Sequence, residues 1–415
     1  MARRRDYRLF LTAQTISNLG SSFTSFGLPL LVFRLTGSPL KLALTTVSGF
    51  LPYLLFGLVI GAWIDRVDRR RVMIGTVVAR GLTIAVLPVL AASGTLVVWD
   101  VYAVAFVNTS LGIASSAIEG TAVPGLVSGR GLARANGALR GGYAAAKVVG
   151  PLLAGALIGG GVPVTGVFVV DAVSFWIAAA MLRAVRTPFN APRAPARTSV
   201  AADIATGLRH VRADPALCVI ALHAALYNLI GSTVTAQLVL FAHERLGAGD
   251  ARVGVLYAGG AAGTAVALLT SSRIADRVPF PVATLGVMTC WSILVLGMSA
   301  STHFVLGALL WTCAAGLPTV YAVQTLTYRQ TAVPEHLLGR VQTTGQVLAW
   351  SAQPVGATVG ATVIHATGDI AAVYAASALL MLVITLFFWL GPFGRSLSAV
   401  RTTTPPMPQR NRRER

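Results

Sequence analysis

Long apolar windows without charged residues alternate with short segments rich in arginine, glycine and proline along most of the chain. An α-helix rises about 1.5 Å per residue, so about 20 apolar residues cross the hydrocarbon core of a bilayer. Most windows fit one crossing, but residues 278–328 are too many for one and are expected to turn near Ser301. The pattern predicts an all-α integral membrane protein with twelve membrane-spanning helices. They are expected at about 8–34, 40–65, 72–94, 98–122, 133–160, 163–186, 215–243, 250–275, 281–300, 303–329, 338–366 and 369–394.

The composition also favours a membrane protein. Of the 415 residues, 55% are hydrophobic and 11% are charged, whereas soluble globular proteins carry about 25% charged residues. So few charged side chains cannot cover a soluble surface, which excludes a soluble enzyme, and the apolar content excludes a disordered chain. The three cysteines lie in apolar segments without metal or disulfide spacing, so we expect them to contact lipid or to fill packing space.

A net charge of +19 suggests either nucleic acid or an anionic membrane surface as a partner. When the N-terminus is placed in the cytoplasm, 27 of the 33 basic residues fall on the cytoplasmic side, four fall outside and two lie within helices. Basic residues collect in the cytoplasmic loops of membrane proteins. Both termini are therefore predicted to be cytoplasmic, and the charge is explained without a nucleic-acid partner.

The two halves of the chain share short motifs at an offset of about 210 residues. Asp-Arg-Val occurs at 65–67 and 276–278, and Thr-Ala-Val-Pro occurs at 121–124 and 331–334. Each pair is expected on one side of the membrane, which indicates two parallel six-helix bundles, an arrangement typical of transporters. The predicted domains are six-helix bundles at 1–186 and 215–394, a cytoplasmic linker with a short amphipathic helix at 187–214, and a disordered basic tail at 395–415.

The predicted loop after the second helix carries Gly61, Asp65, Arg66, Arg69 and Arg70. This spacing resembles the signature of the major facilitator superfamily (MFS) between its helices 2 and 3. The resemblance implies that the glycine permits close helix approach, and that the acid meets the positive end of a helix in the other half. The arginines would then complete a latch for one conformation. Helix N-termini do favour carboxylates. The alternative is a basic cytoplasmic loop with an incidental acid.

Gly142, Gly150, Pro151 and Gly155 in the fifth predicted helix resemble the antiporter motif of drug exporters in this superfamily. Proline kinks a helix, and glycine lets a neighbouring helix approach to backbone distance. Ordinary packing of small residues is therefore the alternative interpretation.

The segments 14–20 and 170–175 look like the macrolide-efflux and enterobactin-exporter-like branch of the superfamily, whose members are 12-helix drug/proton antiporters. Two departures put the usual proton-coupling residues in doubt. Many relatives carry an acid at the position of Ser21, and the helix 4 arginine typical of one group of proton-coupled exporters is absent.

Four charged residues are expected inside the membrane, where a charge costs about 2.5–3.5 kcal/mol at mid-bilayer and needs a partner or a function. Lys147 and Asp171 have similar depths, so we predict a pair that responds to protonation or to an anionic substrate; a static pair is the alternative. Glu119 is a candidate proton carrier, and it could equally pair with Arg80 or meet solvent.

In the fold implied by the resemblance, helices 1, 4, 7 and 10 line a central cavity. Polar side chains recur at helical spacing on these four helices, and they are candidates for substrate contact. The alternative is that they join helices by hydrogen bonds. The candidates are Gln14, Asn18, Asn108, Tyr227, Asn228, Tyr321 and Gln324.

No phosphate-binding loop, metal-ligand spacing or catalytic triad pattern occurs in the sequence, so neither an enzyme nor a cofactor is expected. Without an ATP site, uphill transport would draw on an ion gradient. The sequence therefore predicts a monomeric transporter of the cell membrane that exports small amphipathic molecules (a drug, an antibiotic, a siderophore or another secondary metabolite) in exchange for protons, by rocker-switch alternating access. A metabolite importer or facilitator of the same fold is the alternative, and a membrane-embedded receptor or enzyme is a remote one.

Overall fold

The computed structural model describes residues 2–64, 67–127, 131–187, 189, 208–333 and 335–391, and this part of the chain is helical without a strand. Residues 208–213 within the predicted linker are also helical. The remaining elements are α1 Ala2–Thr36, α2 Pro39–Ile64, α3 Arg69–Ala92, α4 Val98–Leu126, α5 Gly131–Gly159, α6 Gly166–Ala184, α8 Pro215–Ala236, α9 Leu238–Glu244, α10 Asp250–Arg277, the π-helical turn η1 Val282–Gly286, α11 Val287–Ala300, α12 Phe304–Ala332, α13 Glu335–Thr367 and α14 Ile370–Leu390.

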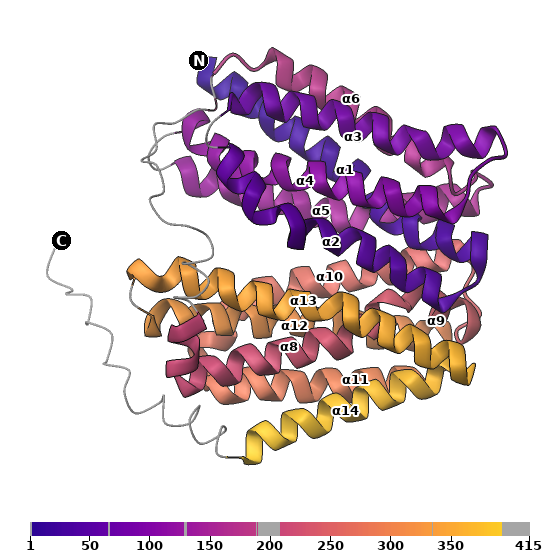
Figure 1. Cartoon of the computed structure of the whole chain (residues 1–415), viewed down its shortest axis with the longest axis vertical. Helices are drawn as coiled ribbons and strands as arrows, with labels where there is room; N and C mark the ends of the chain where they lie inside the picture. Colours follow the sequence, from indigo (N-terminus) through magenta and orange to yellow (C-terminus); the bar gives the residue numbers. More distant parts are fainter. Residues whose placement is uncertain are drawn as a thin grey trace, which may run out of the picture.

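The helices lie side by side in two groups, with α1–α6 forming one half of the molecule and α8–α14 the other (Figure 1). The start of α1 and the end of α14 lie at the same end of the helices. We call this the basic end, because the arginines in the first turns of α1 and at the start of α3 lie there. We call the opposite end, where α1 stops and α10 begins, the far end.

Eleven helical segments in the described part of the chain are long and apolar enough to cross a membrane. The 33-residue α13, which lies beside α8 and α2, is not one of these eleven segments. The sequence predicts a further span in this region, at 338–366. The prediction of an all-helical membrane protein is confirmed. One predicted span is divided, since the helix expected at 215–243 is interrupted at Gln237 between α8 and α9. The predicted tail at 395–415 lies outside the described residues, as does most of the predicted linker.

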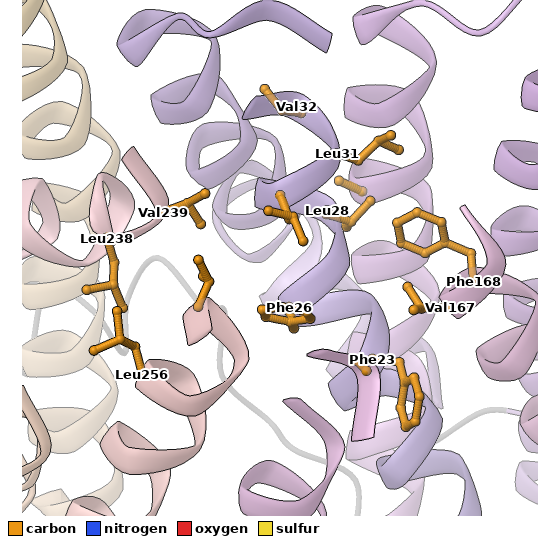
Figure 2. Close-up of a cluster of buried hydrophobic side chains, with 14 of the residues drawn as sticks. Phe23, Phe26, Leu28, Leu31, Val32, Val167, Phe168, Leu238, Val239 and Leu256 are labelled. Carbon is orange, nitrogen blue, oxygen red and sulfur yellow. The ribbon is translucent and has the colours of Figure 1, made fainter. Parts of the chain in front are cut away.

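The α1 helix is the central element of the first half, and it packs against α4, α5 and α6. Figure 2 shows its apolar side chains, among them Phe23, Phe26 and Leu28, between residues of α6 and residues of the other half. The partners are Val167 and Phe168 on one side and Leu238, Val239 and Leu256 on the other. One apolar core therefore continues across both halves, and the halves are in contact through it.

Candidate functional site

At the far end, α5 and α10 meet through backbone rather than through side chains. A Cβ added to Gly254 would lie 2.5 Å from the carbonyl oxygen of Pro151, and one added to Gly155 would lie 3.1 Å from the carbonyl oxygen of Ala251. Small residues allow membrane helices to approach this closely. This glycine seam, formed by Pro151 and Gly155 of α5 with Ala251 and Gly254 of α10, joins the two halves.

The remaining glycines of the predicted antiporter motif face the helix of their own half. A Cβ on Gly150 would lie 2.4 Å from Cβ of Ser22, and one on Gly142 would lie 3.0 Å from Oγ1 of Thr15, both on α1. The motif therefore divides α5 into one stripe that packs on α1 and another that packs on α10.

A second contact between the halves joins α1 to α9 and α10. Arg34 forms an ion pair with Asp250, and the ring of Phe33 stacks on His243 with 4.6 Å between centroids. His243 Nε2 lies 3.1 Å from Asp250 Oδ1. The carboxylate of Asp250 is therefore balanced by Arg34 across the two halves.

Arg34→Gln is expected to shift the balance between closed and open far ends by no more than about fivefold. The Arg34 side chain is half exposed, and exposed ion pairs contribute about 0.2–1 kcal/mol. The labelling rate of an introduced thiol at the buried position Ala248 (Ala248→Cys) measures this opening. Arg252→Gln is the matched control, because Arg252 stacks on Phe304 of its own half; an equal effect in both variants would argue against the Arg34 contact.

The α2 and α13 helices close the other flank of the far end. Ala43 of α2 is fully buried in a cluster with Ala357 and Ala361 of α13. Gln237, at the break between α8 and α9, donates from Nε2 to the carbonyl oxygen of Pro39 at 2.9 Å. The interrupted helix thus provides a hydrogen bond between the halves that an unbroken helix would not offer.

Asp171 is sealed inside the first half with 0% of its surface exposed. Thr24 of α1 donates to its Oδ2, and Ser174 Oγ lies 3.4 Å from its Oδ1. A Cβ on Gly20 would lie 2.5 Å from Asp171 Oδ1, so only glycine leaves room for the carboxylate at this point of α1. The predicted partner Lys147 is not among its contacts. This conformation does not bring Lys147 and Asp171 together, because α6 packs on α1 and α3 and its contact with α5 is slight.

Arg80 is the cation that lies near Asp171. Its Nε donates to Asn108 Oδ1 at 2.9 Å and its Nη2 donates to Ser21 Oγ at 3.3 Å. Its guanidinium lies over the ring of Phe175, with Cζ 4.3 Å from the centroid. Arg80 interacts electrostatically with Asp171 without a direct ion pair in the described part of the chain. Two neutral polar side chains, from α4 and α1, and the aromatic ring of Phe175 on α6 therefore hold this partly buried charge.

Glu119 accepts a hydrogen bond from Gln14 Nε2 at 2.8 Å, which links α4 to α1. The suggested pairing of Glu119 with Arg80 does not occur, since Arg80 is directed to Asn108 and Ser21. The Glu119 side chain is partly exposed, unlike that of Asp171. The two acids thus differ in access, although both receive hydrogen bonds from neutral side chains.

Three predicted cavity residues are turned to neighbouring helices of their own half. Tyr321 donates to the carbonyl oxygen of Ile220 at 3.2 Å, and Gln324, 4% exposed, donates to the carbonyl oxygen of Ser271 at 3.0 Å. Asn228 accepts from Gln353 at 2.5 Å. In this conformation Tyr321 and Gln324 therefore join α12 to α8 and α10.

The remaining cavity candidates have mixed surroundings. Gln14 and Asn108 belong to the hydrogen bonds with Glu119 and Arg80. Tyr227 packs edge-on against Trp291, with 5.3 Å between ring centroids. Asn18 is half-buried on α1, and its carbonyl oxygen accepts from Ser22.

The structure describes only some of the residues of the predicted latch. Asp65 and Arg66 lie outside the described residues, and nothing tests the role proposed for Gly61. Arg69 is buried, and Arg70 Nη2 donates to the carbonyl oxygen of Arg183 at the end of α6 at 2.7 Å. Asp68, which was not predicted, caps α3 by accepting from the backbone N–H groups of Arg70 and Arg71.

Sequence reasoning missed the far-end contacts and the hydroxyl partners of Asp171. A signal for the first existed, since Arg34 and Asp250 are opposite charges next to corresponding predicted loops of the two halves. No comparable signal marked Thr24, because single threonines are common in apolar helices and do not indicate which residue they contact.

Two groups of apolar helices that meet at one end, with charged side chains placed within their apolar spans, are the architecture of a secondary transporter. The chain belongs to the Major Facilitator Superfamily, whose sequence profile it matches over residues 10–356. It is thus a small-molecule transporter of the cell membrane and not an enzyme. The resemblance drawn from the loop and helix motifs is confirmed at the level of this family.

Characterised relatives are efflux proteins. The chain is 25% identical to macrolide efflux protein A of Streptococcus pyogenes, over 84% of this chain and 86% of that protein. It is 29% identical to the multidrug efflux pump Tap of Mycolicibacterium fortuitum, over 88% of this chain and 91% of that protein.

Solved structures show the same fold. A bacterial homologue of the iron transporter ferroportin in an inward-facing state matches with a TM-score of 0.74 at 16% identity, over 93% of this chain and 99% of that one. A bacterial homologue of the human lysosomal transporter Spinster, inward-facing and unoccupied, matches with a TM-score of 0.71 at 15% identity, over 97% of each chain. At these identities the likeness concerns the fold alone.

Proposed function

We propose that the chain exports small amphipathic molecules in exchange for protons, as a monomer that alternates between two conformations. The names of the two efflux relatives support export of drug-like compounds. We further propose twelve spans, with α13 as the eleventh, arranged as two six-helix halves with both termini in the cytoplasm. With the basic end in the cytoplasm, closure of the far end makes the present conformation inward-facing.

The observation that carries proton coupling is that neutral side chains donate to both Glu119 and Asp171. Glu119 accepts from a neutral amide, and Asp171 accepts from hydroxyl groups. A carboxylate held by neutral donors can gain a proton without breaking an ion pair, and burial raises the cost of its charged form. Of the two acids, Glu119 has the partial exposure that exchange with solvent requires, so we assign the proton to Glu119. Asp171 then balances the charge of Arg80.

Glu119→Gln is expected to lower transport driven by a pH gradient at least tenfold, while exchange of substrate across the membrane without a gradient continues. The amide keeps the size of the side chain and loses the proton-binding group. Proteoliposomes containing the full chain, assayed with a dye panel with and without an imposed pH gradient, provide the measurement. Glu244→Gln, at an exposed far-end position, is the matched control.

Two outcomes would contradict this proposal. If no compound moves uphill in wild-type proteoliposomes under any pH gradient, the chain is not a proton-coupled exporter of these compounds. If Glu119→Gln keeps full gradient-driven transport while Asp171→Asn loses it with folding intact, the proton belongs to Asp171 instead.

A further inference from the structure

Tyr143 and Lys147 lie on the stripe of α5 that is directed to the other half. Residues four apart share one side of a helix, so Tyr143, Lys147, Pro151 and Gly155 form a continuous stripe. Pro151 and Gly155 contact α10 in the glycine seam. Towards the basic end α10 no longer covers this stripe. Tyr143 is 49% exposed there, and Lys147 is exposed as well. Both side chains therefore face the space between the halves at the point where the halves part.

The amine of Lys147 has no acid partner. Its Nζ lies 4.8 Å from the centroid of the Tyr143 ring, and no carboxylate of the described residues lies within ion-pair distance of it. The two acids predicted inside helices of this half have other partners, since Thr24 donates to Asp171 and Gln14 donates to Glu119. Lys147 lies in the middle of α5, where a charge facing lipid costs about 2.5–3.5 kcal/mol. An unpaired lysine at this depth is better explained by a partner that the protein itself does not supply.

Aromatic rings from both halves lie around the same space. Tyr53 of α2 and Trp350 of α13 meet edge-to-face across the two halves, with 6.5 Å between ring centroids. Both are nearly half exposed. Tyr53 interacts electrostatically with Tyr143 and Arg80, which places α2, α3 and α5 around one region. Such rings provide flat apolar surfaces with polar edges.

We propose that Lys147, with Tyr143, Tyr53 and Trp350, binds the anionic group of an aromatic substrate that carries a carboxylate or a sulfonate. The ammonium group meets the anion as a point charge with three donors, and the rings cover the apolar body. This inference rests on the proposed transport function and names the substrate class for it.

The sequence offers a selective probe of this site, because Lys41 and Lys147 are the only two lysines among its 33 basic residues. Amine acylation of the full chain in nanodiscs, followed by mass spectrometry, reports on each lysine separately. Pyrenebutyrate is expected to protect Lys147 from acylation at least fivefold and to leave Lys41 unprotected. Pyrenemethylamine, a cation with the same ring system, is expected to protect neither. Equal protection by both compounds, or by neither, would overturn the inference.

Variants test the same site by equilibrium binding. Lys147→Met is expected to weaken pyrenebutyrate binding at least tenfold, whereas Lys147→Arg stays within threefold of wild type. Lys41→Met is the matched control at an exposed far-end position. Unchanged binding in Lys147→Met would refute the role of the amine. Failure here is distinct from failure of the exporter proposal: anion binding without uphill transport removes the exporter alone, and uphill transport of cations with Lys147 unprotected removes this site alone.

Discussion

Gly155→Leu is expected to lower transport at least tenfold while the protein still inserts into the membrane. A Cβ at this position already lies 3.1 Å from a backbone oxygen of α10, and backbone cannot move aside as a flexible side chain can. Overpacking of this kind costs about 1–3 kcal/mol, and 1.4 kcal/mol changes a population tenfold. Because the clash exists only when the far end is closed, the open form becomes the preferred one.

Transport in proteoliposomes and thiol accessibility together measure this effect. With the three native cysteines replaced by serine, a thiol placed by Ala43→Cys is buried in the closed far end. It is expected to react with a membrane-impermeant reagent faster in Gly155→Leu than in wild type. Gly141→Leu is the matched control in the same helix, since open space surrounds that position. Wild-type transport in Gly155→Leu, or equal losses in both variants, would contradict the role of the seam.

The opposite perturbation is a covalent bond across the same end. Ala43→Cys combined with Ala361→Cys, in the background without native cysteines, is expected to abolish transport on oxidation and to regain it on reduction. Both alanines are fully buried in one contact cluster between α2 and α13. A disulfide requires Cβ atoms about 3.5–4.5 Å apart, so the pair is chosen from the small residues of one contact cluster. The cross-link holds the far end closed and so prevents the alternation between conformations.

Single-cysteine variants treated with the same oxidant serve as controls, and Ala43→Cys with Ala357→Cys gives a second pair from the same cluster. A cross-linked protein that still transports would show that the far end does not open during the cycle. That result would also remove the physical basis of the Gly155→Leu prediction.

The arrangement of helices along the sequence was predictable, because hydrocarbon thickness sets the length of each apolar window. The break at Gln237 was not. No glycine or proline adjoins it, and the contact that Gln237 makes at the break is with Pro39, which lies far away in the sequence.

The partners of the buried charges could not be predicted from depth alone. Lys147 and Asp171 were matched because their distances from the helix ends agreed, yet the neighbours of each helix are decided by tertiary packing. The structure places α6 against α1 and α3, so Asp171 meets Thr24 and approaches Arg80. A buried acid in one helix therefore indicates a partner without saying on which helix to find it.

A similar limit applies to polar stripes. Helical spacing grouped Tyr321 and Gln324 on one face of α12, which was correct as geometry. The same pattern arises when the face meets a cavity and when it meets a neighbouring helix, and here both side chains donate to backbone carbonyl groups of α8 and α10.

The glycine seam between α5 and α10 has a consequence for the speed of the cycle. Interlocked side chains must change rotamer as two helices part, whereas backbone facing backbone has no rotamers to change. The seam itself is therefore expected to separate with little internal friction. Viscosity of the surrounding lipid would then set the pace, so turnover should slow in stiffer bilayers more than the temperature dependence of the protein alone would explain.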